Sequence, residues 1–414
     1  MIKKISIEQL RVGMYVHDIN CGWLDHPFLL NKFFVPDEAT LARIVRTGTR
    51  EVYIDTDLGD DLPREQLPAA GRHDAARSKD EVDRELLAEL RRLVGARAPA
   101  RPRVPAREEL FYARSTANEA KRVVSSVMHS VRAGRQFALA EVEDVVGQLA
   151  ESVLRNPQAL IGLTRIRQRD HYTFEHSVSV AVFMLAFARY LGFDESTVRA
   201  LGVGGLLHDI GKTRIPLNIL NKPGPLSEDE YLVMREHVNL GCALLDEHGG
   251  VGPIAMAVVK EHHERCDGNG YPLRLQGDGI SRYGQMAAIV DVYDAITADR
   301  AYHHAEVPTR VLGRLLEWSA HHFDQQLVSQ FIRCVGIYPV GSLVRLMNGW
   351  IGVVVEQGDE DLLHPKVRAV YDTRKRAFMP PQDLDLATIE GDDYRIEGAV
   401  AEERWGINGA DYLE

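Results

Sequence analysis

The feature that most constrains this chain is helical periodicity, which runs through its middle from Glu108 to about Gly336. Apolar residues recur there every three or four positions, segment after segment, as in helices that bury one face. The expected helices span 110–132, 139–154, 173–191, 195–208, 228–247, 251–263, 281–298, 307–320 and 323–335. Such helices bury their apolar faces against one another, so the sequence predicts a mainly α protein built around a helical bundle.

Two smaller units flank the predicted bundle. Residues 1–57 combine strand-like segments at 28–35 and 51–54 with a short helix after Asp37, which indicates a small α/β domain. Residues 58–107 are rich in proline, alanine and arginine and are expected to form a linker. Residues 337–414 are expected to form a β-rich tail, with strands at 342–346, 350–356 and 366–371 and a hairpin turn at Asn348-Gly349.

Composition excludes several classes of protein. The net charge of −11 argues against non-specific binding of duplex DNA, which needs a basic surface. The longest apolar stretch, 178–188, is about half of what a membrane-spanning helix requires, so membrane insertion is not expected. The four cysteines are far apart in the sequence, which is typical of reduced thiols in a cytoplasmic protein.

Seven residues with metal-binding side chains lie on or at the ends of separate predicted helices. They are His176, His208, Asp209, His237, His262, His263 and Asp291. Taken singly, each has a structural explanation: a core histidine, a solvated pair formed by Asp291 and Asp294, or polar residues at a helix end. A helical bundle, however, can direct such side chains from several helices into one interior site.

The number of these side chains indicates how many ions they would hold. Five imidazoles and two carboxylates are too many for one ion that keeps an open position, but they suit two ions sharing a carboxylate. Two ions about 3.5–4 Å apart act as a clamp in phosphoester hydrolysis and acidify a bridging water to hydroxide. The sequence therefore predicts a dinuclear site for divalent iron, manganese, nickel or zinc, which attracts an anionic substrate despite the acidic chain.

The same residues resemble the HD-GYP family, a bacterial branch of the HD hydrolase superfamily. The resemblance rests on His208-Asp209-Ile210-Gly211-Lys212 and on the segment from His262 to Pro272, and it is closest over 165–340, with a metal core at 165–305. Residues 1–57 resemble a small domain that often precedes HD-GYP modules. The resemblance implies hydrolysis of cyclic di-GMP to the linear dinucleotide pGpG, which many family members convert further to GMP.

The family resemblance also implies a role for each residue. One metal would take His176, His208, Asp209 and Asp291, and the second would take Asp209, His237, His262 and His263, with Asp209 as the bridge. Some members have a glutamate where this chain has Tyr172, and that glutamate helps to hold a third metal, so two metals are expected here.

Four further residues are expected to contact the substrate by the same resemblance. Lys212 would touch the substrate phosphate or the leaving oxygen, and Arg300 would pair with phosphate. Tyr271 would pack near a guanine. His303 replaces a lysine of some members, which would weaken phosphate binding or make it pH-dependent. The alternatives are a rigid turn without ligand contact at 268–272 and a structural salt bridge at Arg300.

Two classes of function remain open at this point. The first is a cytoplasmic metal-dependent phosphodiesterase acting on cyclic di-GMP or a related cyclic dinucleotide. The second is a weakly active or inactive nucleotide-binding module that acts through a protein partner. The complete ligand set favours the enzyme. A homodimer and a signalling-protein partner are both compatible with the sequence, which does not specify the native metal.

Overall fold

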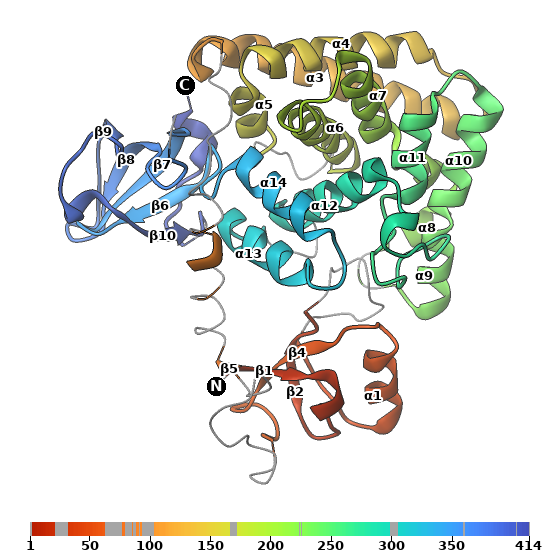
Figure 1. Ribbon diagram of the computed structural model, residues 1–414, viewed down its shortest axis with the longest axis horizontal. Helices are drawn as coiled ribbons and strands as arrows, with labels where there is room; N and C mark the ends of the chain where they lie inside the picture. Colours follow the sequence, from red (N-terminus) through yellow and green to blue (C-terminus); the bar gives the residue numbers. More distant parts are fainter. Residues whose placement is uncertain are drawn as a thin grey trace.

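The computed structural model describes most of the chain and shows a mainly α protein, as the sequence predicted. The described residues are 2–20, 32–62, 77–78, 85, 88–90, 92, 103–165, 172–222, 224, 226–298, 305–358, 361–402 and 404–413. A helical bundle lies between a small N-terminal sheet domain and a C-terminal sheet (Figure 1). Among the described residues, no helix has the combination of length and hydropathy needed to cross a bilayer.

In its described residues, the N-terminal domain is a five-stranded sheet with one α-helix and the short 3-10 helix Ile7–Gln9. It consists of β1 (Ile2–Ser6), β2 (Tyr15–Asp18), β3 (Phe33–Phe34), α1 (Glu38–Val45), β4 (Glu51–Asp55) and β5 (Arg77–Ser78). The strand order is β3-β2-β4-β1-β5, and each pairing is antiparallel. The Asp37 side chain caps α1 by accepting a hydrogen bond from the Thr40 N–H. Of the predicted strand at 28–35, residues 28–31 lie outside the described part.

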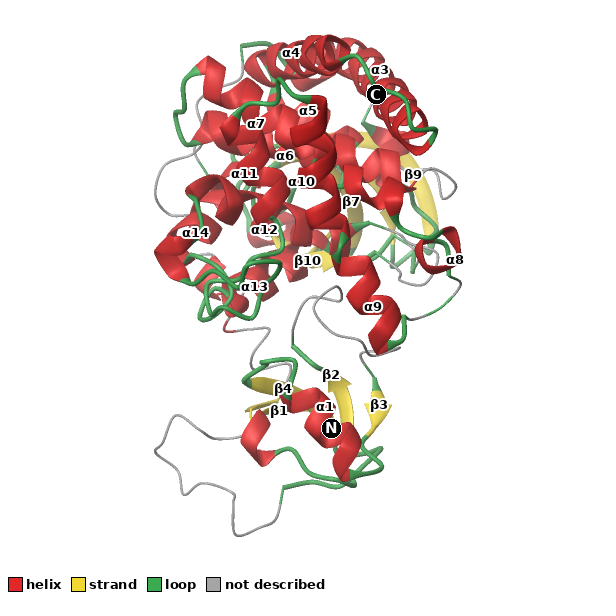
Figure 2. Ribbon diagram, turned by 90° about the vertical axis from the view of Figure 1, so that its right-hand side faces the viewer, coloured by secondary structure: helices red, strands yellow, loops and turns green. Residues whose placement is uncertain are grey.

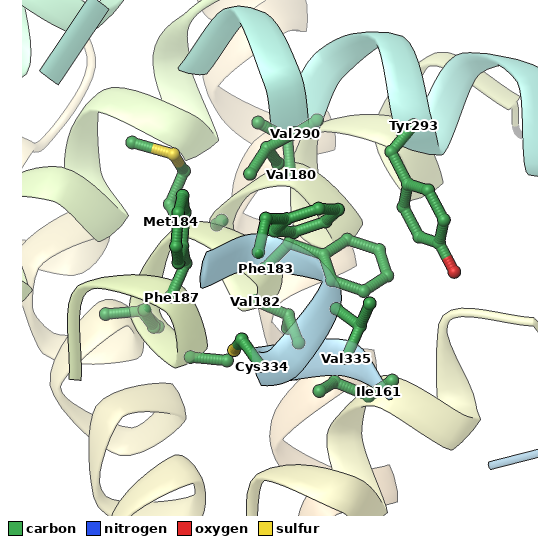
Figure 3. Packing of buried hydrophobic residues seen from close by; sticks show 14 of the residues in the cluster. Ile161, Val180, Val182, Phe183, Met184, Phe187, Val290, Tyr293, Cys334 and Val335 are labelled. Atoms are coloured by element: carbon green, nitrogen blue, oxygen red, sulfur yellow. The ribbon is translucent and has the colours of Figure 1, made fainter. Parts of the chain in front are cut away.

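The bundle is built around α6 (Tyr172–Tyr190) and the helices packed on it. The others are α3 (Ala106–Arg132), α4 (Leu139–Arg155), α5 (Pro157–Leu163), α7 (Glu195–Leu207), α8 (Leu217–Leu220), α9 (Glu228–Arg235), α10 (His237–His248), α11 (Pro253–Glu261), α12 (Arg282–Thr297), α13 (Pro308–Trp318) and α14 (Gln325–Val335). Residues 178–188 of α6 are all buried, as expected of a core helix that is apolar on every side. Phe183 packs edge-to-face against Tyr293 (Figure 3). Phe187 packs in the same way against Phe331.

One predicted helix proves to be two. The sequence indicated a single helix over 228–247, but the structure divides it at Glu236 into α9 and α10. The last turn of α9 tightens because the Glu236 N–H donates to the Val233 carbonyl three residues back. The Met234 carbonyl is instead 2.7 Å from Nδ1 of His237. The break places His237 at the start of α10, which matters for the site described below.

The C-terminal sheet has five antiparallel strands in the order β10-β6-β7-β8-β9. The three predicted strands correspond to β6 (Leu343–Leu346), β7 (Trp350–Glu356) and β8 (Lys366–Asp372). The sequence did not indicate β9 (Ala377–Asp385) or β10 (Ile396–Val400). Pro380 and Pro381 argue against a strand, but β9 lies at the edge of the sheet, where missing N–H donors are tolerated.

Candidate metal centre

The structure brings all seven predicted ligands into one buried cluster inside the bundle. α6 provides His176, the end of α7 provides His208 and Asp209, and the start of α10 provides His237. The end of α11 provides His262 and His263, and the middle of α12 provides Asp291. Each of the seven is at most 3% exposed. The cluster therefore depends on the mutual packing of five helices.

Asp209 lies between two groups of ligands and directs one carboxylate oxygen toward each. Oδ2 is 3.3 Å from Nε2 of His208 and 3.7 Å from Nε2 of His176, whereas Oδ1 is 3.4 Å from Nε2 of His237. His176, His208 and Asp291 form one compact group, and His237, His262 and His263 form another. Ligand atoms within each group lie within 4.8 Å of one another. This is the arrangement expected of two cations joined by a shared carboxylate.

Helix ends orient three of the histidines. Nδ1 of His208 lies 2.8 Å from the Gly205 carbonyl, that of His237 lies 2.7 Å from Met234, and that of His262 lies 2.8 Å from Val259. Each acceptor is three residues upstream in the last turn of a helix, where carbonyls lack helical partners. With Nδ1 donating to that carbonyl, the lone pair of Nε2 is left for a metal.

His176 is oriented by a carboxylate that the sequence analysis did not assign to the site. Nδ1 of His176 is 2.7 Å from Oδ2 of Asp294, which is fully buried. The alternative of a solvated Asp291–Asp294 pair on the helix surface is wrong, because both side chains are buried. Their spacing of three residues on α12 was the available signal, since it places both on one helix face.

The charges and unsatisfied atoms of the cluster fit a divalent metal. Burial lowers the pKa of His237 to about 4 and that of His262 to about 3, so both imidazoles are neutral near pH 7. The pKa of Asp209 falls well below its usual value because His208 and Lys212 outweigh the effect of burial. Among the described residues, His208 Nε2, Asp209 Oδ1, His263 Nδ1 and Asp291 Oδ2 are buried without a hydrogen-bond partner. Cations bound there would satisfy these atoms, which are otherwise costly to bury.

Lys212 connects the cluster to solvent. It belongs to the short 3-10 helix Ile210–Arg214, and its Nζ is 2.6 Å from Oδ2 of Asp209. Its side chain is 21% exposed, whereas each of the seven ligands is at most 3% exposed. Gly211 allows this helix to approach α10, because a Cβ there would lie 1.8 Å from the His237 carbonyl oxygen. The glycine thus keeps Asp209 and His237 side by side.

The loop after α11 covers one side of the cluster. The Tyr271 ring stacks on the His263 ring with a centroid distance of 4.5 Å and an interplanar angle of 27°. The carbon of the Arg235 guanidinium lies 4.3 Å from the Tyr271 centroid. The Tyr271 ring thus contacts both an imidazole and a guanidinium, and the residue is buried. That Tyr271 packs near a guanine, as the family resemblance implies, stays a prediction.

Two backbone features hold this loop in place. The buried Glu264 carboxylate accepts hydrogen bonds from the N–H groups of Leu273 at 2.7 Å and Leu275 at 2.9 Å. Gly270 packs so closely that a Cβ would lie 2.4 Å from the Arg265 backbone nitrogen. Sequence reasoning assigned no role to Glu264 or Arg235. Arg300 and His303 lie outside the described residues, and so does the side chain of Tyr172.

Comparisons with known proteins agree with this geometry. A model of the HD domain matches residues 147–327, and a model of a domain of unknown function matches residues 2–142. The chain is 38% identical over 414 residues to the cyclic di-GMP phosphodiesterase PA4108 of Pseudomonas aeruginosa, covering 100% of this chain and 95% of that protein.

Two shorter similarities are to proteins of Vibrio cholerae. A cyclic di-GMP phosphodiesterase is 34% identical over 190 residues, which is 42% of this chain and 38% of that protein. A 3′3′-cGAMP-specific phosphodiesterase 2 is 35% identical over 164 residues, which is 39% of this chain and 31% of that protein.

Proposed function

The chain belongs to the HD-GYP family of metal-dependent phosphodiesterases, and from this premise we propose that it hydrolyses cyclic di-GMP at a dinuclear metal centre. The products would be the linear dinucleotide pGpG and then GMP. The observation that carries the proposal is Asp209, whose two carboxylate oxygens face different histidine groups. A single-ion site would not need this second group of buried imidazoles.

The residues divide between the two ions as follows. His176, His208 and Asp291 would hold one ion, and His237, His262 and His263 would hold the other, with Asp209 shared. Two bound divalent ions would supply an acidified water and neutralise charge on the phosphoryl oxygens. Iron, manganese, nickel and zinc all accept imidazole and carboxylate ligands.

Lys212 is the residue that would act directly on the substrate. Its ammonium already lies against the shared carboxylate, and its side chain is partly exposed. There it would donate a hydrogen bond to a phosphate oxygen or to the leaving oxygen, where it offsets developing negative charge.

The extent of similarity favours cyclic di-GMP over another cyclic dinucleotide. One relative named for cyclic di-GMP matches over the whole of this chain and another over 42% of it, whereas the relative named for 3′3′-cGAMP matches over 39% of it. A purely receptor-like role fits less well, because binding a nucleotide does not require seven buried ligands and Lys212.

The test is incubation of cyclic di-GMP with the purified protein loaded in turn with iron, manganese, nickel and zinc. Product chromatography should show pGpG, followed by GMP, for at least one metal. Asp209→Ala should bind less metal and give no turnover, while Asp144→Ala, at an exposed position of α4, should behave as the wild type. Absence of product from the fully loaded wild type would overturn the proposed activity. Turnover by a metal-free Asp209→Ala protein would overturn the dinuclear centre.

A further inference from the structure

The positively charged side chain of Arg235 lies beside the metal centre, and the predicted site did not include it. Arg235 is the last residue of α9, two positions before His237. Its guanidinium covers Tyr271, which in turn stacks on His263. The guanidinium carbon is therefore no more than about 9 Å from the centre of the His263 ring. Unlike the seven ligands, Arg235 is only half-buried, so the stack leads from the cluster to its rim.

Arg235 also differs from other arginines of this chain in its partners. Arg314 pairs with Glu306 and Asp18, and Arg155 pairs with Glu109. Within the part of the chain that the structure describes, no carboxylate pairs with Arg235. Its recorded contacts are with the faces of Tyr271 and Tyr231. Stacking uses the flat face of a guanidinium and leaves the N–H donors at its edge available.

We propose that Arg235 binds the second phosphodiester of the cyclic dinucleotide, the one that is not at the metal centre. This inference rests on the proposed function. A cyclic dinucleotide carries two phosphodiesters, and the metals and Lys212 serve one of them. The other needs a cation at the rim of an acidic protein, and a guanidinium can contact it through two parallel hydrogen bonds. Tyr271 acts as a positioning residue that holds the guanidinium flat.

The experiment compares two substrates in an Arg235→Ala variant. For cyclic di-GMP, kcat/KM should fall roughly 10- to 100-fold, the effect of losing a hydrogen bond to a charged group, mainly through a higher KM. Bis(p-nitrophenyl) phosphate has a single phosphodiester, so its hydrolysis should change little. Metal content should match the wild type. Arg235→Lys keeps the charge but lacks the planar guanidinium, so its kcat/KM for cyclic di-GMP should lie between those of the wild type and Arg235→Ala.

A matched control comes from α12. Arg282 lies with its guanidinium carbon 5.3 Å from the Phe193 ring, which is a similar stack at an exposed position outside the cluster. Arg282→Ala should leave both substrates and the metal content unchanged.

Three results would overturn the inference. In the first, Arg235→Ala hydrolyses cyclic di-GMP as well as the wild type does. In the second, Arg235→Ala contains less metal, or its activity falls equally on both substrates, which would mean that Arg235 supports His263 through Tyr271. In the third, the wild type itself hydrolyses bis(p-nitrophenyl) phosphate but not cyclic di-GMP. That last result removes the proposed function and this inference together, and the wild type alone reveals it.

Discussion

Replacing Asp294 tests whether the residues around the ligands, and not the ligands alone, determine metal affinity. Its carboxylate is 2.7 Å from Nδ1 of His176, and the two side chains are 0% and 3% exposed, so solvent does not screen the contact. A hydrogen bond to a charged group contributes about 1.5–3 kcal/mol, against about 1 kcal/mol for a neutral pair. Asp294→Asn keeps the shape of the side chain but loses its charge, and should weaken the free energy of metal binding by about 1–1.5 kcal/mol. Asp294→Ala loses the whole bond and leaves Nδ1 unsatisfied, and should cost about 2–3 kcal/mol.

These energies convert directly into metal affinity. Because about 1.4 kcal/mol is tenfold, Asp294→Asn should bind metal about tenfold more weakly and Asp294→Ala about 100-fold. Titration against a competing chelator measures both values, and circular dichroism checks that the fold is retained. Asp144→Asn, at an exposed position, is the control and should bind as the wild type. The reasoning is refuted if both Asp294 variants bind metal normally, or if the asparagine variant binds more weakly than the alanine variant.

Three further predictions follow from the structure. The purified protein should contain about two transition ions per chain by elemental analysis, and full activity with one ion or none would contradict the shared role of Asp209. Glu317→Gln should lower the free energy of unfolding in urea by about 1–2 kcal/mol, because Lys4 of the N-terminal domain is buried against Glu317 at 2.5 Å and would keep only its second carboxylate partner, Glu51; an unchanged midpoint would exclude this contribution. The pKa of Asp267 is lowered to about 2 because His322 and the Asn269 N–H outweigh burial. The contribution of Asp267 to the free energy of unfolding is therefore complete above its ordinary pKa of 3.8 and is lost as the pH falls toward 2. Between these pH values, the free energy of unfolding of Asp267→Asn should depend less on pH than that of the wild type.

The parts of the site that could be predicted are those encoded locally. His208-Asp209 and His262-His263 are adjacent pairs at helix ends. Once these pairs are identified, the isolated residues His176 and Asp291 become candidate ligands of the same site. Asp294 could not be assigned with the same certainty, because its role depends on how α12 is rotated against α6. The contact between Arg235 and Tyr271 joins residues far apart in the sequence, and it depends on the break between α9 and α10 that the periodicity did not reveal.

The N-terminal domain contributes none of the seven ligands, yet its contacts converge on the elements that surround them. Lys4, Asn20 and Tyr53 all contact the Glu317 carboxylate on α13, and these contacts join the N-terminal domain to the bundle. Arg43 pairs with Glu228 at the start of α9, the helix that approaches this domain in Figure 2. Gly48 packs so closely on the Asn269 side chain that a Cβ would lie 2.4 Å from its amide nitrogen. The N-terminal domain thus contacts both elements that form the Arg235–Tyr271 stack, because Arg235 lies on α9 and Tyr271 lies in the loop that contains Asn269. A rotation of the N-terminal domain about Glu317 would therefore have to move α9 or the loop around Asn269, or break the contact with it.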